Sequence, residues 1–151
     1  MYISTMTTGI GRLWLGVDDK ALLRVSFTPL EGKHKETAVL KQAKAEIAEY
    51  MNGTRQNFTV PTKLVGTDFQ INVWNILRQI PYGKVWSYKQ VAEMLGNPQC
   101  SRAIGSAAHK NPLPIVIPCH RVVLNSGALG GYGGGTEIKQ KLLDLETMST
   151  L

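Results

Sequence analysis

Residues 87–111 read SYKQVAEMLGNPQCSRAIGSAAHKN, and this stretch decides the fold of the second half of the chain. Ser87 is a residue type that caps helix N-termini, and apolar residues follow it at helical spacing. Gly96 suits the position just after a helix, and Asn97-Pro98 then forces a turn into a second helix of small residues. Two short helices around a tight turn predict a helix-turn-helix, whose second helix faces nucleic acid.

The charge around this stretch agrees with a polyanionic partner. The segment 78–121 has six basic residues and a single acid, Glu93, which gives it a local net charge of +5. The net charge of +6 on the whole chain divides evenly between the two halves, so only the local cluster indicates a surface. A basic surface of this kind is typical of proteins that contact phosphates. The basic residues are Arg78, Lys84, Lys89, Arg102, Lys110 and Arg121.

A cysteine and a histidine stand side by side further along the chain. The apolar run 115–117 predicts a buried strand that ends at Pro118, and Cys119 and His120 follow. A neighbouring imidazole is a common means of forming a thiolate, because an isolated thiol is only a few per cent ionised near neutral pH. On an extended chain the two side chains point to opposite sides, so a water molecule or a bend has to connect them. The simpler alternative is that Cys119 is a small buried apolar residue.

Several short motifs follow one another between Phe69 and Glu146. They are Ser87-Tyr88, Arg102-Ala103-Ile104-Gly105, Lys110-Asn111-Pro112-Leu113-Pro114, Pro118-Cys119-His120-Arg121-Val122-Val123, Ser126-Gly127-Ala128, Gly131-Tyr132-Gly133-Gly134, and Leu142-Leu143 with Glu146. Together they resemble the C-terminal domain of the O6-alkylguanine-DNA alkyltransferases, repair proteins that take the alkyl group onto themselves. The resemblance covers a little over half of the chain, and its motifs stand in the family's order.

The resemblance implies a role for each of five residues in the chemistry. Cys119 would accept the alkyl group, with His120 acting through water as its base. Glu146 would hold the other imidazole nitrogen, Tyr88 would give a proton to the departing guanine, and Asn111 would brace the turn beside the helix-turn-helix. The product is a thioether that water does not cleave, so the protein would act once, with no cofactor and no metal.

The resemblance also implies how the protein binds a flipped base. Arg102 would enter the duplex in place of the base, and Tyr88 would rotate the neighbouring phosphate. Small residues on the second helix would let its backbone approach the DNA. The residues expected to contact the guanine or to form the lid over it are Val122, Tyr132, Gly133, Pro114 and Ser126. The residues expected to contact DNA are Arg102, Ser87, Tyr88, Ala103, Gly105 and Lys110.

The first half of the chain predicts a small unit of mixed structure. Three apolar stretches separated by turn residues predict an antiparallel meander, and a segment of helical spacing follows them. The expected fold class is therefore α+β, with an antiparallel-sheet and helix domain over residues 1–66 and a mostly helical, winged-helix-like domain over 67–151. The expected elements of the first domain are strands over 3–6, 13–17 and 22–27, a helix over 36–52, and an edge strand or linker over 58–65.

Composition and cysteine content indicate the cellular compartment in which the protein works. No apolar run approaches the ~20 residues of a membrane span, and the first residues lack the features of a signal peptide. Cys100 and Cys119 are the only cysteines, and a disulfide between them would consume the nucleophile, which favours the reducing cytoplasm. Zinc-bearing members of the resembled family place cysteine and histidine in the N-terminal half, and no cysteine precedes residue 100 here, so the resemblance implies no structural metal site. We expect a cytoplasmic monomer that acts on double-stranded DNA containing alkylated bases.

Other functions share some of these residues. An alkyltransferase-like binding protein flags lesions without removing them, but such relatives carry tryptophan in the place of Cys119. A cysteine hydrolase built on Cys119, His120 and Glu146 would turn over repeatedly, and a helix-turn-helix regulator would prefer one DNA sequence. At single residues, the simpler interpretations are a phosphate contact for Arg102 and a solvated ion pair for Glu146. Cys100 has no assigned role.

Overall fold

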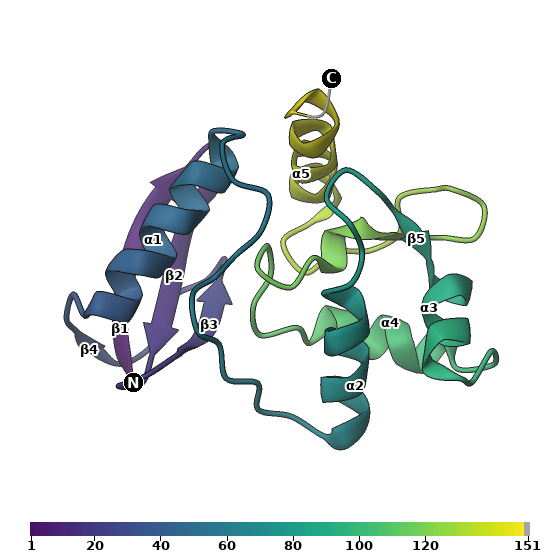
Figure 1. The fold of residues 1–151 in the computed structure, drawn as a ribbon, viewed down its shortest axis with the longest axis horizontal. Coiled ribbons are helices and arrows are strands. Elements are labelled where there is room, and N and C mark those ends of the chain that lie inside the picture. The colour runs from purple at the N-terminus through teal and green to yellow at the C-terminus, as the bar shows by residue number, and fades with distance from the viewer. Residues whose placement is uncertain (150–151) are drawn as a thin grey trace. The chain divides into compact units, whose positions relative to one another are not determined.

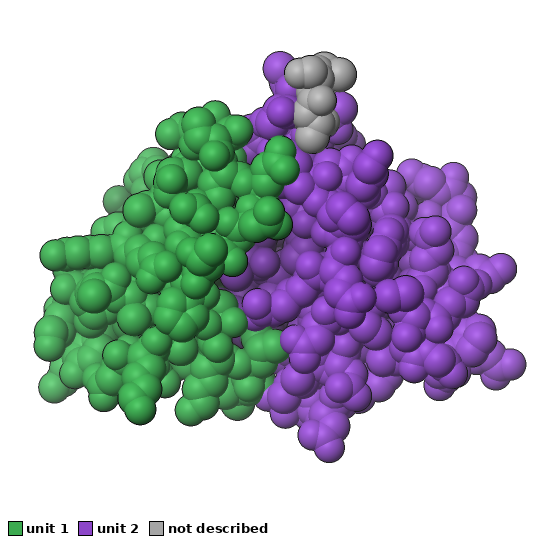
Figure 2. All heavy atoms as spheres, viewed as in Figure 1, with its two compact units in different colours: residues 1–65 green, residues 66–151 purple. Residues whose placement is uncertain are grey.

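The computed structural model describes residues 1–149, and the chain divides into two compact units between Val65 and Gly66 (Figures 1 and 2). The first unit combines a small sheet with one long helix. The second unit is mostly helical, and its described residues, 66–149, include a two-stranded sheet. The expected α+β class, with the sheet in the N-terminal part and the helices in the C-terminal part, is confirmed.

The sheet of the first unit has the strand order β3-β2-β1-β4 (Figure 1). Strands β1 (Tyr2–Thr8), β2 (Gly11–Val17) and β3 (Leu22–Ser26) form the expected antiparallel meander. A short strand, β4 (Lys33–His34), pairs parallel to β1 at the edge. The sequence did not predict β4, because both of its residues are polar and exposed. Helix α1 (Ala38–Met51) packs on β1, β2 and β3.

Helix α1 begins where Thr37 accepts a hydrogen bond from the Leu40 amide, which places its start two residues after the predicted one. Its buried face meets the apolar side chains of the sheet, so this unit has a core of its own. Residues 58–65 form no strand; only an isolated bridge joins Thr62 to Leu22. Of the two expected alternatives for this segment, the structure therefore shows the linker.

The second unit begins with α2, whose N-terminus is a capping box formed by Thr67 and Gln70. A second capping box, formed by Ser87 and Gln90, starts α3. Reciprocal bonds of this kind satisfy amides that a helix cannot satisfy itself. The elements of this unit are α2 (Asp68–Leu77), β5 (Trp86–Ser87), α3 (Tyr88–Leu95), α4 (Ser101–His109), a 3-10 turn η1 (Cys119–Arg121), β6 (Val122–Val123) and α5 (Thr136–Ser149).

Helices α3 and α4 form the predicted helix-turn-helix (Figure 1). Gly96 ends α3 with a φ of 84°, a conformation that a residue with a side chain adopts only with strain. Val91 and Ala92 of α3 and Ile104 of α4 are fully buried. The Trp74 indole of α2 donates to the Ala107 carbonyl of α4 at 2.8 Å. Helix α4 is therefore fixed to α2 as well as to α3.

The buried strand predicted over residues 115–117 is wrong. The run is a turn closed by a 2.7 Å bond from the Ile117 amide to the Leu113 carbonyl, and Ile115 has a φ of 77°. Prolines 112, 114 and 118 lack the amide that a strand ladder needs, so the apolar run is buried by packing instead of pairing. Cys119 and His120 consequently lie on a 3-10 turn and not at the end of a strand.

Candidate active site

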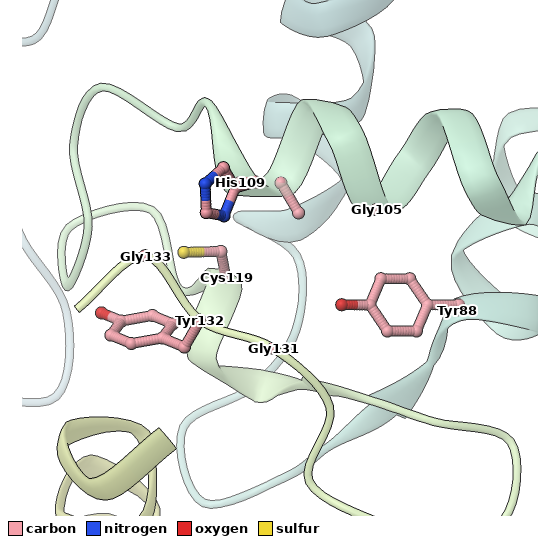
Figure 3. Close-up of a pocket in the computed structure, with 8 residues that line it drawn as sticks. Tyr88, Gly105, His109, Cys119, Gly131, Tyr132 and Gly133 are labelled. Atoms are coloured by element: carbon pink, nitrogen blue, oxygen red, sulfur yellow. The ribbon is translucent and has the colours of Figure 1, made fainter. Parts of the chain in front are cut away.

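The Cys119 thiol lies in a small pocket of about 80 Å³ in the second unit. Figure 3 shows the Tyr88 hydroxyl pointing from α3 toward the cysteine, with Tyr132 on the loop that precedes α5. Glycines contribute much of the wall, so the space beside the sulfur is not filled by side chains. The lining residues are Tyr88, Gly105, Ala108, His109, Cys119, Gly131, Tyr132 and Gly133.

Burial dominates the chemistry of the Cys119 thiol. It raises the pKa of the thiol to about 11, although a hydrogen bond with Asn111 and the positive charge of Lys139 act in the other direction. At neutral pH the resting group is therefore a thiol. Asn111 itself is fixed, because its Nδ2 donates to the Ile117 carbonyl at 2.9 Å and its Oδ1 accepts from the Leu113 amide at 2.9 Å. These bonds hold the turn that leads to Cys119.

His120 is completely buried and bound to Glu146 of α5. The distance from His120 Nε2 to Glu146 Oε2 is 2.6 Å. When the ring is neutral, its proton lies on Nε2 and is donated to the carboxylate, so the ring atom that can accept a proton is Nδ1. Burial lowers the pKa of His120 against the opposing effect of Glu146. The resting imidazole is therefore neutral, with its proton on Nε2. Its Nδ1 can then accept the proton of the thiol, as a base must.

Glu146 is shared between His120 and Arg121. The Arg121 guanidinium donates to both carboxylate oxygens, at 2.8 and 2.9 Å, and to the Ile80 carbonyl at 2.8 Å. The Gly83 amide adds a bond of 3.1 Å to Glu146. Burial raises the pKa of Glu146, but the bonds from His120 and Arg121 outweigh it and bring the pKa to about 2. Glu146 is thus an ionised, fully bonded acceptor, and not a solvated one.

One of the six basic residues that were predicted to form a DNA-facing surface does not lie on the surface. Arg121 is only 6% exposed and is occupied by Glu146, so it does not face DNA. The sequence did not reveal this because a charge count carries no information on burial. The remaining members of the cluster are exposed: Arg78, Lys84, Lys89, Arg102 and Lys110.

Lys139 is a buried residue that the sequence reasoning missed. Its ammonium donates to the carbonyls of Val122 at 2.6 Å, Leu129 at 2.5 Å and Gly131 at 3.2 Å. Lys139 is fully buried, and burial lowers its pKa. A signal was present, because Lys139, Leu142 and Glu146 share one face of a helix whose other charged residues are exposed.

The structure brings only some of the predicted site residues to the pocket. Cys119, Tyr88, Gly105, Tyr132 and Gly133 line it directly. An adjacent open groove of about 600 Å³ contains Arg102 together with Tyr88, Gly105, Gln99, Ser101, Leu124 and Asn125. Three lining residues, Ala108, His109 and Gly131, were not among the predicted site residues.

The other predicted residues lie away from the pocket lining. Pro114 is buried in the turn before Cys119, and Val122 is buried with its carbonyl bonded to Lys139. Ser126 is exposed and accepts a bond from the Ala128 amide. The remaining predicted DNA contacts are Ser87, which caps α3, exposed Ala103 on α4, and exposed Lys110, which caps the C-terminus of α4.

Comparison with known proteins identifies the family. The model of the 6-O-methylguanine DNA methyltransferase DNA-binding domain matches residues 68–148, and the model of the ribonuclease-like domain of the same proteins matches residues 1–64. The chain belongs to the 6-O-methylguanine DNA methyltransferase family. Among the residues described, 1–149, no group of three or more His, Cys, Asp or Glu side chains is placed to hold a metal ion, and no helix is long and apolar enough to span a membrane.

Relatives match this family member over nearly its whole length. The constitutive methylated-DNA–protein-cysteine methyltransferase of Bacillus subtilis is 39% identical, with 98% of this chain and 96% of the relative covered. The enzyme of the same name from Methanosarcina acetivorans is 37% identical, with 97% and 98% covered. The crystal structure of Mycobacterium tuberculosis OGT in complex with DNA superposes with a TM-score of 0.93 at 36% identity, covering 99% of this chain and 94% of that one.

Proposed function

We propose that this protein removes the alkyl group from O6-alkylguanine in double-stranded DNA by transferring it irreversibly to its own Cys119. The observation that carries the proposal is a buried cysteine in a pocket that is lined by α3 and α4 of a helix-turn-helix, next to a histidine bound by a buried carboxylate. The names of the relatives and the DNA complex of a similar structure support it. O4-alkylthymine is proposed as a second substrate.

The transfer begins with ionisation of the thiol. The Cys119 proton passes through a water molecule to Nδ1 of His120, while Nε2–H stays bonded to Glu146. The sulfur electron pair then forms a bond to the alkyl carbon, and the bond from that carbon to O6 breaks. The electron pair of the broken bond goes to the guanine, whose ring nitrogen takes a proton from Tyr88, and the imidazolium proton restores the tyrosine. The products are guanine and an uncharged thioether, and the thioether ends the activity.

The lesion lies on the base-pairing edge, so the nucleotide has to leave the duplex before the sulfur can reach it. Flipping costs a few kcal/mol, less for a damaged pair. We propose that Arg102, exposed beside the pocket, fills the vacated space, and that Tyr88 displaces the phosphate. Small residues on α4, Ala103 and Gly105, let the helix backbone approach the minor groove. Ser87 and Lys110 are proposed as contacts to the DNA backbone.

The flipped guanine would be recognised largely by backbone groups. We propose that the backbone around Cys119 and Val122 accepts from its exocyclic amine and that the amide between Tyr132 and Gly133 donates to O6. Pro114 and Ser126 are proposed to support the turn and the lid around the base, since neither lines the pocket. We also propose that residues 1–66 and 67–151 are separate domains, and that the protein works as a cytoplasmic monomer without a cofactor.

One measurement tests this function against its alternatives. The protein is incubated with a duplex that carries one O6-methylguanine, and its intact mass and peptide map are then recorded. We expect one methyl group per protein, located on Cys119, and a duplex restored to guanine. A lesion-binding relative or a DNA-sequence regulator gains no mass, and a cysteine hydrolase cleaves ester or peptide substrates over many turnovers.

We expect Arg102→Ala to slow repair of duplex about tenfold or more and to change repair of a methylated single strand by less than about threefold. Only the duplex needs a group to replace the flipped base, and 1.4 kcal/mol of lost support corresponds to tenfold. Single-turnover transfer rates on the two substrates measure the difference. Arg78→Ala, an equal loss of charge at the end of α2 and outside the groove, is the control. Equal losses on both substrates would make Arg102 an ordinary phosphate contact.

A further inference from the structure

Leu124 is an exposed leucine in the groove that holds Arg102. It directly follows strand β6 and is 42% exposed. In the described part of the second unit, residues 66–149, the other exposed large apolar residues are Val85, Met94 and Met148. Leu124 differs from these three because it lines the groove of about 600 Å³ beside the acceptor pocket. A single exposed apolar residue needs no explanation by itself, but this one lies next to a proposed DNA contact.

The loop around Leu124 holds the side chain in a defined position. The Leu124 amide donates to the Ala128 carbonyl and the Leu124 carbonyl accepts from the Gly127 amide, both at 2.9 Å. Gly130, which has a φ of 75°, lies against the leucine side chain. A methyl group on Gly130 would lie 3.4 Å from Leu124 Cδ2, so the leucine packs on the glycine backbone. Its remaining apolar surface is therefore presented in one direction, toward the groove.

The groove matches the sugar-phosphate backbone of DNA in charge and in place. The residues that line it include the Arg102 guanidinium and no carboxylate, which suits phosphates. Tyr88 and Gly105 line both this groove and the pocket of Cys119, so a strand that delivers its base to the pocket has to pass along the groove. Leu124 adds an exposed apolar side chain to this surface, and the apolar part of the DNA backbone is the deoxyribose.

We propose that Leu124 packs against the sugar of a nucleotide beside the flipped one and makes the protein select deoxyribose at that position. This proposal rests on the proposed function and adds a specificity-determining residue to it. Ribose has a hydroxyl on C2′ where deoxyribose has only hydrogen, and this group lets a protein distinguish RNA from DNA. A hydroxyl pressed against leucine loses its water without gaining a hydrogen-bond partner, which is unfavourable. Alkylated RNA is therefore a poorer substrate than alkylated DNA.

Duplexes that carry one O6-methylguanine and a single ribonucleotide test the proposal. The ribonucleotide is placed in turn at each position near the lesion on both strands, and single-turnover transfer rates are measured. We expect it to slow transfer about tenfold at one of these positions, as dehydration of an unpaired hydroxyl does. Leu124→Asn, which offers the hydroxyl a partner at a similar side-chain size, should reduce this penalty to less than about threefold. Met94→Gln, a similar loss of apolar surface on α3 outside the groove, is the matched control and keeps the full penalty.

A fluorine in place of the 2′-hydroxyl separates dehydration from sugar conformation. It favours the same ring pucker as ribose but needs no hydrogen-bond partner, so we expect the 2′-fluoro duplex to react at nearly the rate of the all-DNA duplex. A wild type with no penalty at any position overturns the proposal, and this result needs no variant. An equal penalty with fluorine, or a penalty that Leu124→Asn leaves unchanged, overturns it as well. Failure of the proposed function looks different, because the all-DNA duplex then transfers no methyl group to Cys119.

Discussion

Replacing Cys119 with alanine is expected to abolish alkyl transfer and to leave duplex affinity within a few-fold of the wild type. The sulfur is the proposed acceptor of the alkyl group, and it is 9% exposed at the side of a small pocket. Affinity for DNA comes from exposed cations, which release counterions from the phosphates, and these are unchanged in the variant. Intact-mass analysis after incubation with methylated duplex, together with a salt-dependent binding titration, measures both quantities.

The second cysteine provides the control for this experiment. Cys100 is half-buried at the start of α4, where its thiol donates to the Asn97 carbonyl, and it does not line the pocket. We expect Cys100→Ala to take up one methyl group, as the wild type does. Methylation of Cys100 in the Cys119→Ala protein would show that the pocket does not select the acceptor.

Local signals in the sequence account for the elements that were predicted correctly. Ser87 and Gly96 delimit α3 because a cap and a left-handed residue act within one helical turn, independently of the rest of the chain. The antiparallel meander of the first unit follows from short apolar stretches separated by turn residues. Such features are encoded within a few residues, so a single sequence is sufficient to find them.

Features that depend on long-range packing were predicted poorly. Residues 115–117 have the composition of a strand, but the prolines around them remove the pairing and leave a packed turn. Arg121 was assigned to the surface because its partner lies 25 positions away on α5. The spacing of Lys139 with Leu142 and Glu146 was a signal of its burial, but its partners are backbone carbonyls, which no side-chain pattern reveals. The tertiary arrangement of Glu146, Arg121 and His120 therefore required the structure.

Glu146→Gln is expected to slow transfer by about tenfold or more, to raise the apparent pKa of the Cys119 thiol and to destabilise the fold. The carboxylate favours the imidazolium that forms when His120 takes the thiol proton, and a neutral amide does not. Removing the anion also leaves Arg121 as an uncompensated buried charge, at a cost of roughly 3–5 kcal/mol. Single-turnover rates as a function of pH and denaturant unfolding measure the two effects separately.

Glu137→Gln is the matched control, since it makes the same change at the start of α5. The Glu137 side chain is 86% exposed and lies 3.8 Å from Lys141, so its loss is expected to cost less than about 1 kcal/mol and to leave the transfer rate unchanged. If Glu146→Gln had the same transfer rate and the same stability as this control, Glu146 would contribute no more than an exposed carboxylate. Its hydrogen bond to His120 would then have no role in transfer.

The pH dependence of stability separates the buried carboxylate from the rest of the protein. In the folded state the pKa of Glu146 is about 2, below its ordinary value of 4.5. A depressed carboxylate pKa stabilises the fold fully above the ordinary value, and this stabilisation is lost as the pH falls toward the folded value. The difference in unfolding free energy between the wild type and Glu146→Gln should therefore be constant above about pH 5 and should shrink between about pH 4.5 and 2. If the difference in unfolding free energy between the wild type and Glu146→Gln stayed the same down to about pH 2, the ionised state of Glu146 would not be the cause of the lost stability. The loss would then come from poor packing of the glutamine amide.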